Sequence, residues 1–325
     1  MKKYLIFAAT VILSLQVMAA TLGNINGTYW HDGWAFYKAT EKAGEISFEG
    51  GTLHEGGYGF KVVKGNRGKM VVKSIYDSME SITTSGRSVS GSTIERRTIN
   101  GKDVLLIKSP KGQLTDVLLS LDGDFYNVLV EQQNQQLDGV YNNSGNEISF
   151  DGNGRISFGT SRDKWESYSF VNIYDIPSNI FSVHQDKNHF SYDFDQQYIK
   201  LDEVKAKPGA DWDDDPELET VNSIKLKKMN GLRYKGDGIW PITSVEILTS
   251  GYLSSYNAKT LRLMRNDIYA RHGYKFKNKE LNKIFKEQSW YKPTTSDASS
   301  LKLNEIERIN ITLIQNMEKI ESTDK

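Results

Sequence analysis

A repeated set of short segments in the first two-thirds of the chain constrains the fold most strongly. The repeats are INGTYW (25–30) and LDGVYN (137–142), EISFEGG (45–51) and EISFDGN (147–153), and SIYD (74–77) and NIYD (172–175). Three segments that recur in the same order indicate a duplicated structural unit, here of about 100 residues.

Both copies have the residue pattern of short β-strands. Apolar and polar residues alternate in runs such as KMVVKSIYD (69–77) and SYSFVNIYD (167–175). Turns rich in Gly and Asn, such as KGNRG and DGNGR, separate these runs. The pattern predicts two small antiparallel β barrels or sandwiches, the first over residues 21–134 and the second over 135–229.

The apolar period changes to that of a helix after Asn257. Asn304 and Glu307 have the spacing of a capping box at the start of the last predicted helix. We therefore expect a linker at 230–243 and an all-α module of three helices over 244–325. The apolar stripes of these helices are Leu261, Met264 and Ile268, then Leu281, Ile284 and Phe285, then Ile306, Ile309, Leu313, Met317 and Ile320.

The first twenty residues have the layout of a secretory signal. Lys2 and Lys3 precede an apolar run, Leu5–Leu15, and small residues follow it. We expect export and cleavage near Ala19 or Ala20, with a retained anchor as the alternative. The apolar run is shorter than the roughly 20 residues that a spanning helix needs. These features predict a periplasmic or extracellular protein without a transmembrane span.

The chain contains no cysteine. This excludes disulfides, a catalytic thiol, thiolate metal sites and a lipid-modified cysteine. Lys plus Arg equals Asp plus Glu at 41 each, so the net charge alone predicts no polyanionic partner. Local clusters of charge are more informative than this balance.

The segment NDIYARHGYKFKN (266–278) contains residue types that are common in active sites. On a helical wheel, however, Arg265 and His272 fall on the apolar stripe of the first helix, with Tyr269 at its margin. His272 and Arg271 also suit the negative end of the helix dipole. We interpret Arg265, Tyr269, Arg271 and His272 as structural residues, and a ligand-binding or catalytic role is the alternative.

The residues around the end of this helix fit the same interpretation. Gly273 is expected in the left-handed conformation that ends a helix, and Tyr274 is expected to pack back over the last turn. Asp267 and Arg271 have the i, i+4 spacing of an ion pair.

Four segments of the C-terminal region together resemble the YARHG domain, which is named for Tyr269–Gly273. The resemblance covers about residues 245–317, includes Trp290 and Tyr291, and does not extend to the β repeats. It implies an extracellular bacterial module that occurs in different domain settings, with no reaction attached to it. The segments are LRLMRNDIYARHGYKF (261–276), LNKIF (281–285), QSWYKP (288–293) and LNEIERINITLI (303–314).

The second predicted helix has a basic outer face. Lys279, Lys283 and Lys286 lie at i, i+4 and i+7, opposite its apolar stripe. With Trp290 and Tyr291, they are the candidate partner-binding residues, suited to an anionic envelope polymer, lipid headgroups or an acidic protein. A solvated helix face and docking on the acidic loop at 206–220 are the alternatives. We expect no nucleic-acid partner for an exported protein.

The aromatic segment YWHDGWAFY (29–37) is a second candidate binding surface, besides the lysines. Strand alternation predicts Trp30, Trp34 and Phe36 on one face, filling a β core. The other face would then carry Tyr29, His31 and Tyr37, which could stack on sugars.

The sequence gives little support for a metal site or for a catalytic site. The acidic run from Asp211 resembles a calcium loop, but Pro216 stands where an EF-hand needs Gly; an irregular Ca²⁺ site is the alternative. His184 and His189 would supply at most half a zinc site. The sequence contains no G-x-S-x-G, H-E-x-x-H or P-loop motif. We expect no metal, no cofactor and no enzymatic activity.

These observations predict an exported, non-catalytic binding protein of the bacterial cell envelope. Its partner would be an envelope polymer such as peptidoglycan, or a periplasmic or extracellular protein. The first alternative is a periplasmic inhibitor or immunity protein whose β domains plug the cleft of an enzyme. The second is a glycan or peptide hydrolase, which would need two carboxylates in one cleft.

Overall fold

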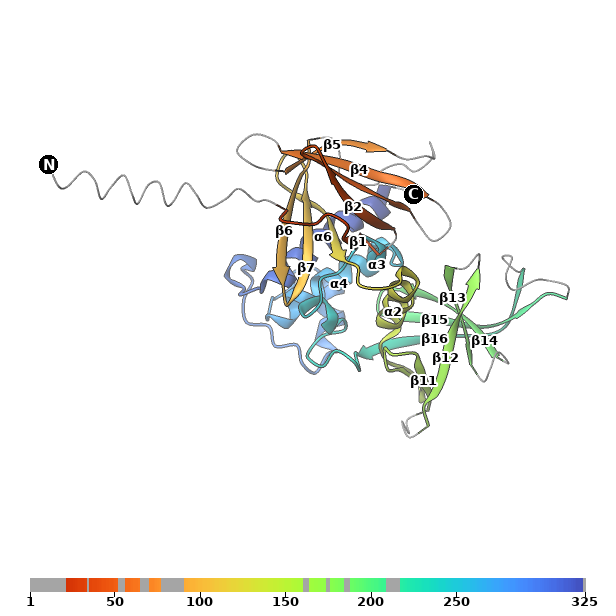
Figure 1. The fold of residues 1–325 in the computed structure, drawn as a ribbon. Coiled ribbons are helices and arrows are strands. Elements are labelled where there is room, and N and C mark those ends of the chain that lie inside the picture. The colour runs from red at the N-terminus through yellow and green to blue at the C-terminus, as the bar shows by residue number, and fades with distance from the viewer. Residues whose placement is uncertain are drawn as a thin grey trace. The chain divides into compact units, whose positions relative to one another are not determined.

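The computed structural model describes residues 22–33, 35–51, 56–64, 70–76, 91–159, 164–173, 176–183, 188–208 and 217–323. The predicted signal segment at 1–20 therefore lies outside the described residues. The chain forms two compact units (Figure 1). The first contains strands β1–β8, and the second contains α2, strands β9–β16 and the C-terminal helices.

The first unit is a closed antiparallel barrel in which each strand pairs with the next along the chain. It closes through β1 and β8, where Trp30 lies opposite Ser120 and His31 opposite Leu119. Its strands are β1 Tyr29–His31, β2 Phe36–Lys42, β3 Glu45–Gly51, β4 Gly56–Lys64, β5 Met70–Tyr76, β6 Thr93–Ile99, β7 Lys102–Lys108 and β8 Leu114–Ser120.

The sheet of the second unit follows the same rule and closes through β9 and β16. The prediction of two antiparallel β domains is confirmed, and both are barrels rather than sandwiches. The strands are β9 Gly139–Asn143, β10 Asn146–Phe150, β11 Arg155–Phe158, β12 Glu166–Ile173, β13 Ile176–Val183, β14 Asn188–Asp195, β15 Tyr198–Ala206 and β16 Leu218–Asn230.

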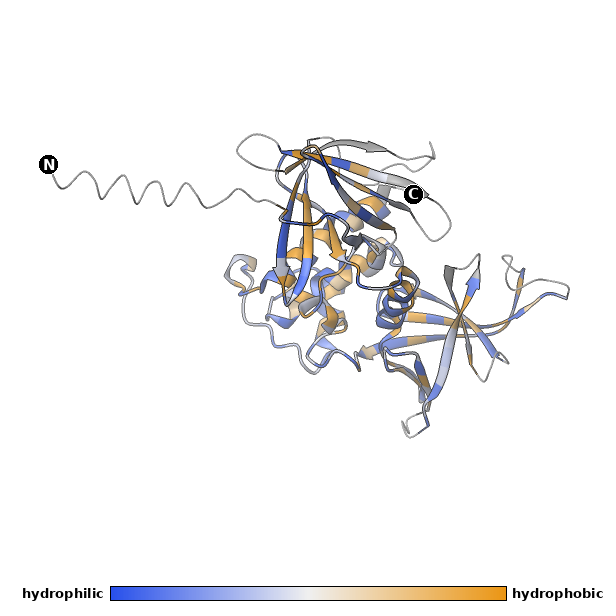
Figure 2. Cartoon of the chain, viewed as in Figure 1, coloured by the Kyte–Doolittle hydropathy of each residue, from blue (hydrophilic) through white to orange (hydrophobic). Residues whose placement is uncertain are grey.

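Alternating side chains fill the interior of each barrel, as the sequence period requires. In β3, Ile46 and Phe48 are buried while Glu49 is exposed, and Phe48 stacks on Phe60 with ring centroids 4.5 Å apart. In the second barrel, Phe150 contacts several aromatic rings of neighbouring strands. Figure 2 shows this alternation as successive orange and blue residues along the strands.

Two of the three sequence repeats occupy matching strands. EISF lies in β3 and in β10, and in each barrel a two-residue turn with positive φ precedes it, Ala43–Gly44 or Ser144–Gly145. The third repeat ends β5 and β12, two strands further on in both cases. The first repeat does not match, because it leads into β1 in one barrel and into β9 in the other, whereas β2 is the counterpart of β9.

The predicted faces of the segment 29–37 need a correction. Trp30 lies opposite Tyr37 in the β1–β2 ladder, so both side chains point to the same face. Both are buried, and Tyr37 contacts the ring of Phe60. The alternation fails because β1 ends at His31 and the chain turns before β2 begins. Tyr37 therefore belongs to the core and not to a sugar-stacking surface, and Trp34 lies outside the described residues.

Helix α2 (Phe125–Leu137) precedes the second barrel and was not expected from the sequence. Asp124 caps it by accepting a hydrogen bond from the Tyr126 N–H. Asn134 accepts a hydrogen bond from the buried Tyr168 hydroxyl, and Gln133 donates to the Ser178 carbonyl. The helix lacks a clear apolar stripe, because several of its polar side chains form hydrogen bonds with hydroxyl and carbonyl groups of the barrel.

The C-terminal region is helical, and the three predicted helices are confirmed as α4, α5 and α6. A short fourth helix, α3, precedes them. Leu261, Met264, Phe285 and Leu313 are fully buried between these helices. The elements are η2 Pro241–Ser244, α3 Ser250–Ser254, α4 Ala258–Arg271, α5 Lys279–Lys286, η3 Ala298–Ser300 and α6 Glu305–Thr323.

The second part of the segment expected to be a linker, residues 238–243, is buried in the helical module, whereas none of the residues 230–237 is fully buried. Ile239 and Trp240 are 0% and 4% exposed. The Pro- and Gly-rich composition that suggested an exposed connection belongs to a tightly held irregular segment. Among the described residues, no helix combines the length and apolar character needed to cross a membrane.

Candidate interaction surface of the helical module

The C-terminal end of α4 is fixed by Gly273. This residue has φ +77°, the left-handed conformation predicted for it. Its N–H donates to the Ala270 carbonyl, and the Tyr274 N–H donates to the Tyr269 carbonyl, which is the Schellman arrangement. The rings of Tyr269 and Tyr274 lie 6.1 Å apart, so Tyr274 packs over the last turn as expected.

Arg265 and His272 both face carboxylates of α6. The guanidinium of Arg265 lies 2.8 Å from a carboxylate oxygen of Glu318. The Nε2 of His272 lies 2.9 Å from both carboxylate oxygens of Glu307. The two residues on the apolar stripe of α4 thus connect α4 to α6.

Asp267 and Arg271 form the expected i, i+4 pair, but they are buried rather than exposed. The Asp267 carboxylate is completely buried and accepts hydrogen bonds from the N–H groups of Ile239 (2.9 Å) and Trp240 (3.1 Å). The guanidinium of Arg271 donates to the Trp240 carbonyl and to the Thr243 hydroxyl. Burial raises the pKa of the Asp267 carboxyl, although Arg271 and the two N–H donors oppose this effect.

Glu307 is the most connected carboxylate of the module. It forms the predicted capping box, in which the Asn304 N–H donates to Glu307 and the Glu307 N–H donates to the Asn304 side chain. The Ser244 hydroxyl donates to the same carboxylate. Burial acts to raise the pKa of Glu307, but the hydrogen bonds from Ser244, His272 and Asn304 outweigh it and lower the pKa below its usual value.

Asn310 was missed by the sequence reasoning. It is fully buried on α6 and accepts a hydrogen bond from the Leu248 N–H. Its side-chain NH₂ donates to the carbonyls of Thr243 and Glu246. An asparagine within an apolar stripe was the available signal, because a buried amide must find partners.

Tyr291, expected to bind a partner, belongs to the core of the module. It is 9% exposed, and its hydroxyl donates to the Tyr274 carbonyl. Its ring contacts Phe276 and Phe285. Trp290 is half-buried against the rings of Phe285 and Tyr291. Tyr291 therefore contributes to the packing of the module, and its expected contact role stays a prediction.

The three lysines of α5 lie on an exposed face. Lys279, Lys283 and Lys286 are exposed and surround a shallow depression with Asn282 and Glu287. Among the described residues, no carboxylate lies within ion-pair distance of their ammonium groups. Glu287 is held by Lys227 of β16 at 2.7 Å, which is the main reason that its pKa is lowered.

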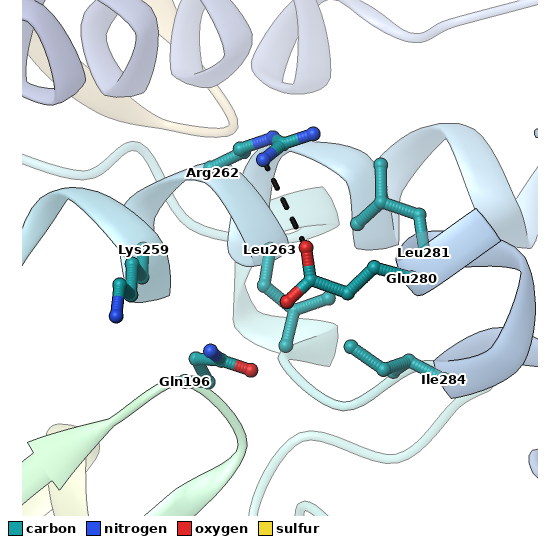
Figure 3. Close-up of a pocket in the computed structure, with 7 residues that line it drawn as sticks. All are labelled: Gln196, Lys259, Arg262, Leu263, Glu280, Leu281 and Ile284. Carbon is teal, nitrogen blue, oxygen red and sulfur yellow. Dashed lines mark ion pairs between the residues drawn. The ribbon is translucent and has the colours of Figure 1, made fainter. Parts of the chain in front are cut away.

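A separate cavity opens on the flank of α5 that faces away from these lysines. It lies where α4, α5 and the turn between β14 and β15 meet (Figure 3). Its apolar floor consists of Leu263, Leu281 and Ile284. Its polar residues are Gln196, Lys259, Arg262 and Glu280.

The two sequence features considered as metal sites lie only partly within the described residues. The acidic run 211–216 and His184 lie outside the described residues. The Nδ1 of His189 lies 2.8 Å from the Ser182 hydroxyl. No group of three metal-ligating His, Asp or Glu side chains occurs in the part of the chain that the structure describes.

The helical module as a whole is a small α domain built around the motif at the end of α4. Residues 238–319 match the family profile of the YARHG domain, so the chain carries a YARHG domain at its C-terminal end. The match begins at residue 238 and therefore includes the segment held by Asp267 and Arg271. No curated protein and no solved structure matches the chain significantly.

Proposed function

We propose that the protein is exported and acts as a binding protein of the bacterial cell envelope, without catalysing a reaction. Its YARHG domain would engage an anionic envelope polymer or an acidic protein through the exposed lysine face of α5, Lys279, Lys283 and Lys286. The observation that carries this proposal is the concentration of exposed positive charge on this face.

The charges of the surrounding chain support the proposal. Every lysine between residues 258 and 292 is exposed. Two of the three arginines of the same stretch are engaged elsewhere, since Arg265 pairs with Glu318 and Arg271 lies within 3.9 Å of Asp267. The lysines therefore supply most of the charge that a ligand at this face would meet.

The geometry of α5 suits a linear or extended anion. With a rise of about 1.5 Å per residue, the i, i+7 spacing of Lys279 and Lys286 extends over roughly 10 Å along the helix. Such exposed charges interact with a polyanion in a manner that salt screens, because the Debye length is about 8 Å at physiological ionic strength. Binding should consequently weaken as salt is raised.

Co-sedimentation with purified peptidoglycan tests the proposal, with vesicles containing anionic phospholipid as a second probe. The test variant carries Lys279→Glu, Lys283→Glu and Lys286→Glu. A matched control carries the same change of charge at Lys205, Lys235 and Lys302, exposed lysines on other elements of the same unit.

The wild type and the control should sediment with one of the two probes at low salt and be released at high salt. The test variant should remain in the supernatant at every salt concentration. Equal sedimentation of the test variant and the wild type would overturn the proposed role of this face.

A specific feature of the second barrel supports the inhibitor as a second candidate function. Strand β16 pairs with β15 along its length, whereas it pairs with β9 only at Lys227, Lys228 and Asn230. The first half of β16 is exposed, including Val221 at 50%. This arm could enter the cleft of an enzyme, and a stoichiometric enzyme that is captured by the wild type but not by Val221→Asp would favour this function.

A hydrolase would need two converging carboxylates. The depression beside the lysines contains only Glu287 and the flank cavity only Glu280 as carboxylates among their lining residues. Neither site offers the pair that glycoside hydrolysis uses.

A further inference from the structure

The cavity on the flank of α5 is held open by contacts between three separate elements. The Gln196 N–H donates to the Thr260 hydroxyl at 2.7 Å, and the Asn257 side chain donates to the Phe194 carbonyl at 3.1 Å. These bonds fix the β14–β15 turn against the first turn of α4. The ion pair from β16 to Glu287 fixes α5 to the same barrel. The cavity is thus pre-formed, as binding sites between packed elements commonly are.

The turn that forms one wall has an unfavourable backbone conformation. Gln196 has φ +56°, which is uncommon for a residue other than Gly, Asn or Asp. Such a conformation costs on the order of 1 kcal/mol and is retained only where the surroundings impose it. Here it places the Gln196 side chain at the mouth of the cavity.

The charged groups of the cavity are close together but incompletely satisfied. The guanidinium of Arg262 and the carboxylate of Glu280 are 4.0 Å apart, which is longer than a hydrogen bond. Figure 3 shows the Glu280 carboxylate projecting from α5 between Arg262 and Gln196, above the side chain of Leu263. Both members of this pair can therefore accept a further partner without breaking a hydrogen bond between them.

We propose that this cavity binds a small aliphatic α-amino acid in its zwitterionic form. The carboxylate of the ligand would lie between Arg262 and Lys259. Its ammonium group would donate to Glu280 and to the side-chain oxygen of Gln196. Its alkyl side chain would cover the apolar floor formed by Leu263, Leu281 and Ile284.

The size of the cavity fits this class of ligand. Its volume is about 140 Å³. An apolar cavity of about 150 Å³ holds a benzene molecule, which has as many non-hydrogen atoms as alanine. Alanine fits within this volume, and the open mouth leaves room for the two additional methyl groups of valine.

The arrangement of charge selects a ligand that bears both signs. A simple anion would leave Glu280 without an opposite charge, and a simple cation would be repelled by Lys259 and Arg262. Only a zwitterion gives each charged wall an opposite partner. This site lies apart from the lysine face of α5, so the proposal does not depend on the function proposed above.

Saturation-transfer NMR of the full chain with L-alanine and L-valine tests the inference. Titration to about 10 mM covers the weak affinities usual for ligands of this size. The variants are Arg262→Gln and Glu280→Gln, each of which removes one charge from the cavity. The matched control is Lys235→Gln, which removes one charge from an exposed lysine that does not line the cavity. Valinamide and N-acetylvaline lack one ligand charge each and distinguish a free amino acid from a peptide terminus.

A signal from L-alanine or L-valine should be reduced at least fivefold in Arg262→Gln and in Glu280→Gln, and should be unchanged in Lys235→Gln. Valinamide and N-acetylvaline should give weaker signals than L-valine. The absence of a signal with the wild type, equal signals in all variants, or stronger binding of either blocked compound would overturn the inference.

Discussion

His272 at the end of α4 and Glu307 at the start of α6 form a partly buried contact in which the histidine Nε2 lies 2.9 Å from both carboxylate oxygens. The same carboxylate accepts hydrogen bonds from Ser244 and from the Asn304 N–H. One side chain thus connects two helices and the segment that precedes them. The histidine of the motif therefore has a structural role that requires no ligand.

Replacing His272 with Ala should lower the melting temperature of the protein. The variant would leave the buried Glu307 carboxylate with one partner fewer, at a cost of about 1–3 kcal/mol. Arg265→Ala should act in the same direction through Glu318. The exposed Lys302 supplies the control, because Lys302→Ala removes no described contact. Calorimetry that finds His272→Ala and Arg265→Ala as stable as the wild type would contradict the structural role.

The stability of the module should fall in acid partly because of Glu307. Its pKa is lowered from the ordinary value of 4.5 in the folded state. The resulting stabilisation is fully present above pH 4.5 and is lost as the pH falls through the lower folded value. Glu307→Gln should be less stable than the wild type at neutral pH, and the difference should shrink below pH 4.5. A difference that stays constant from pH 7 to pH 3 would argue against this explanation.

Gly273→Ala should lower the free energy of unfolding by more than the cost of placing an alanine in the left-handed conformation. A Cβ at this position would lie 2.6 Å from the Thr294 hydroxyl and 2.9 Å from the Lys292 carbonyl. Gly145→Ala is the matched control, since it also has positive φ but a Cβ there would meet nothing within 4 Å. The control should cost about 1–2 kcal/mol, and Gly273→Ala should cost more in chemical denaturation. Equal losses would show that the close approach is relieved without cost.

Lys228 of β16 should destabilise the protein at neutral pH. It is 5% exposed, and its ammonium group donates to the Asp138 carbonyl and lies 3.3 Å from the Tyr141 hydroxyl. Burial lowers its pKa from 10.5 to about 8, although Asp138 and Asp267 oppose the shift. The unfolded chain therefore holds the proton more tightly, and stability should rise as the pH increases from 8 to 10.5.

Lys228→Met should be more stable than the wild type at pH 7, by about 1–3 kcal/mol. This gain should disappear above about pH 10.5, where the wild-type lysine becomes neutral in the unfolded chain as well as in the folded protein. Urea denaturation at the two pH values checks the expectation, with the exposed Lys235→Met as the control. A loss of stability at pH 7 would show that the two hydrogen bonds of Lys228 outweigh the cost of burying its charge.

Local patterns predicted the elements whose side chains have a single buried face. The alternation in β3 and β10 and the stripes of α5 and α6 are of this kind, and they were assigned correctly. The capping box of Asn304 and Glu307 and the left-handed Gly273 were also predictable, because these features depend only on neighbours along the chain.

Features that depend on distant contacts were not predictable. Helix α4 is buried on more than one side, whereas a helical wheel identifies only one apolar stripe. The wheel therefore could not show that the Asp267 carboxylate accepts a hydrogen bond from the Trp240 N–H. Tyr37 was placed on the wrong face because the break between β1 and β2 is invisible in the alternation. The cavity beside Glu280 includes Gln196, which is far away in sequence, and only the tertiary structure brings them together.

The bound fraction of the Lys279/Lys283/Lys286→Glu variant on purified peptidoglycan and anionic vesicles, at a temperature where it is fully folded, tests the central claim most directly. The account predicts that this variant melts like the wild type but does not bind the probe that retains the wild type, whereas His272→Ala melts earlier and still binds that probe while it is folded. Retained binding by the lysine variant would contradict the claim that α5 is the contact surface of this YARHG domain.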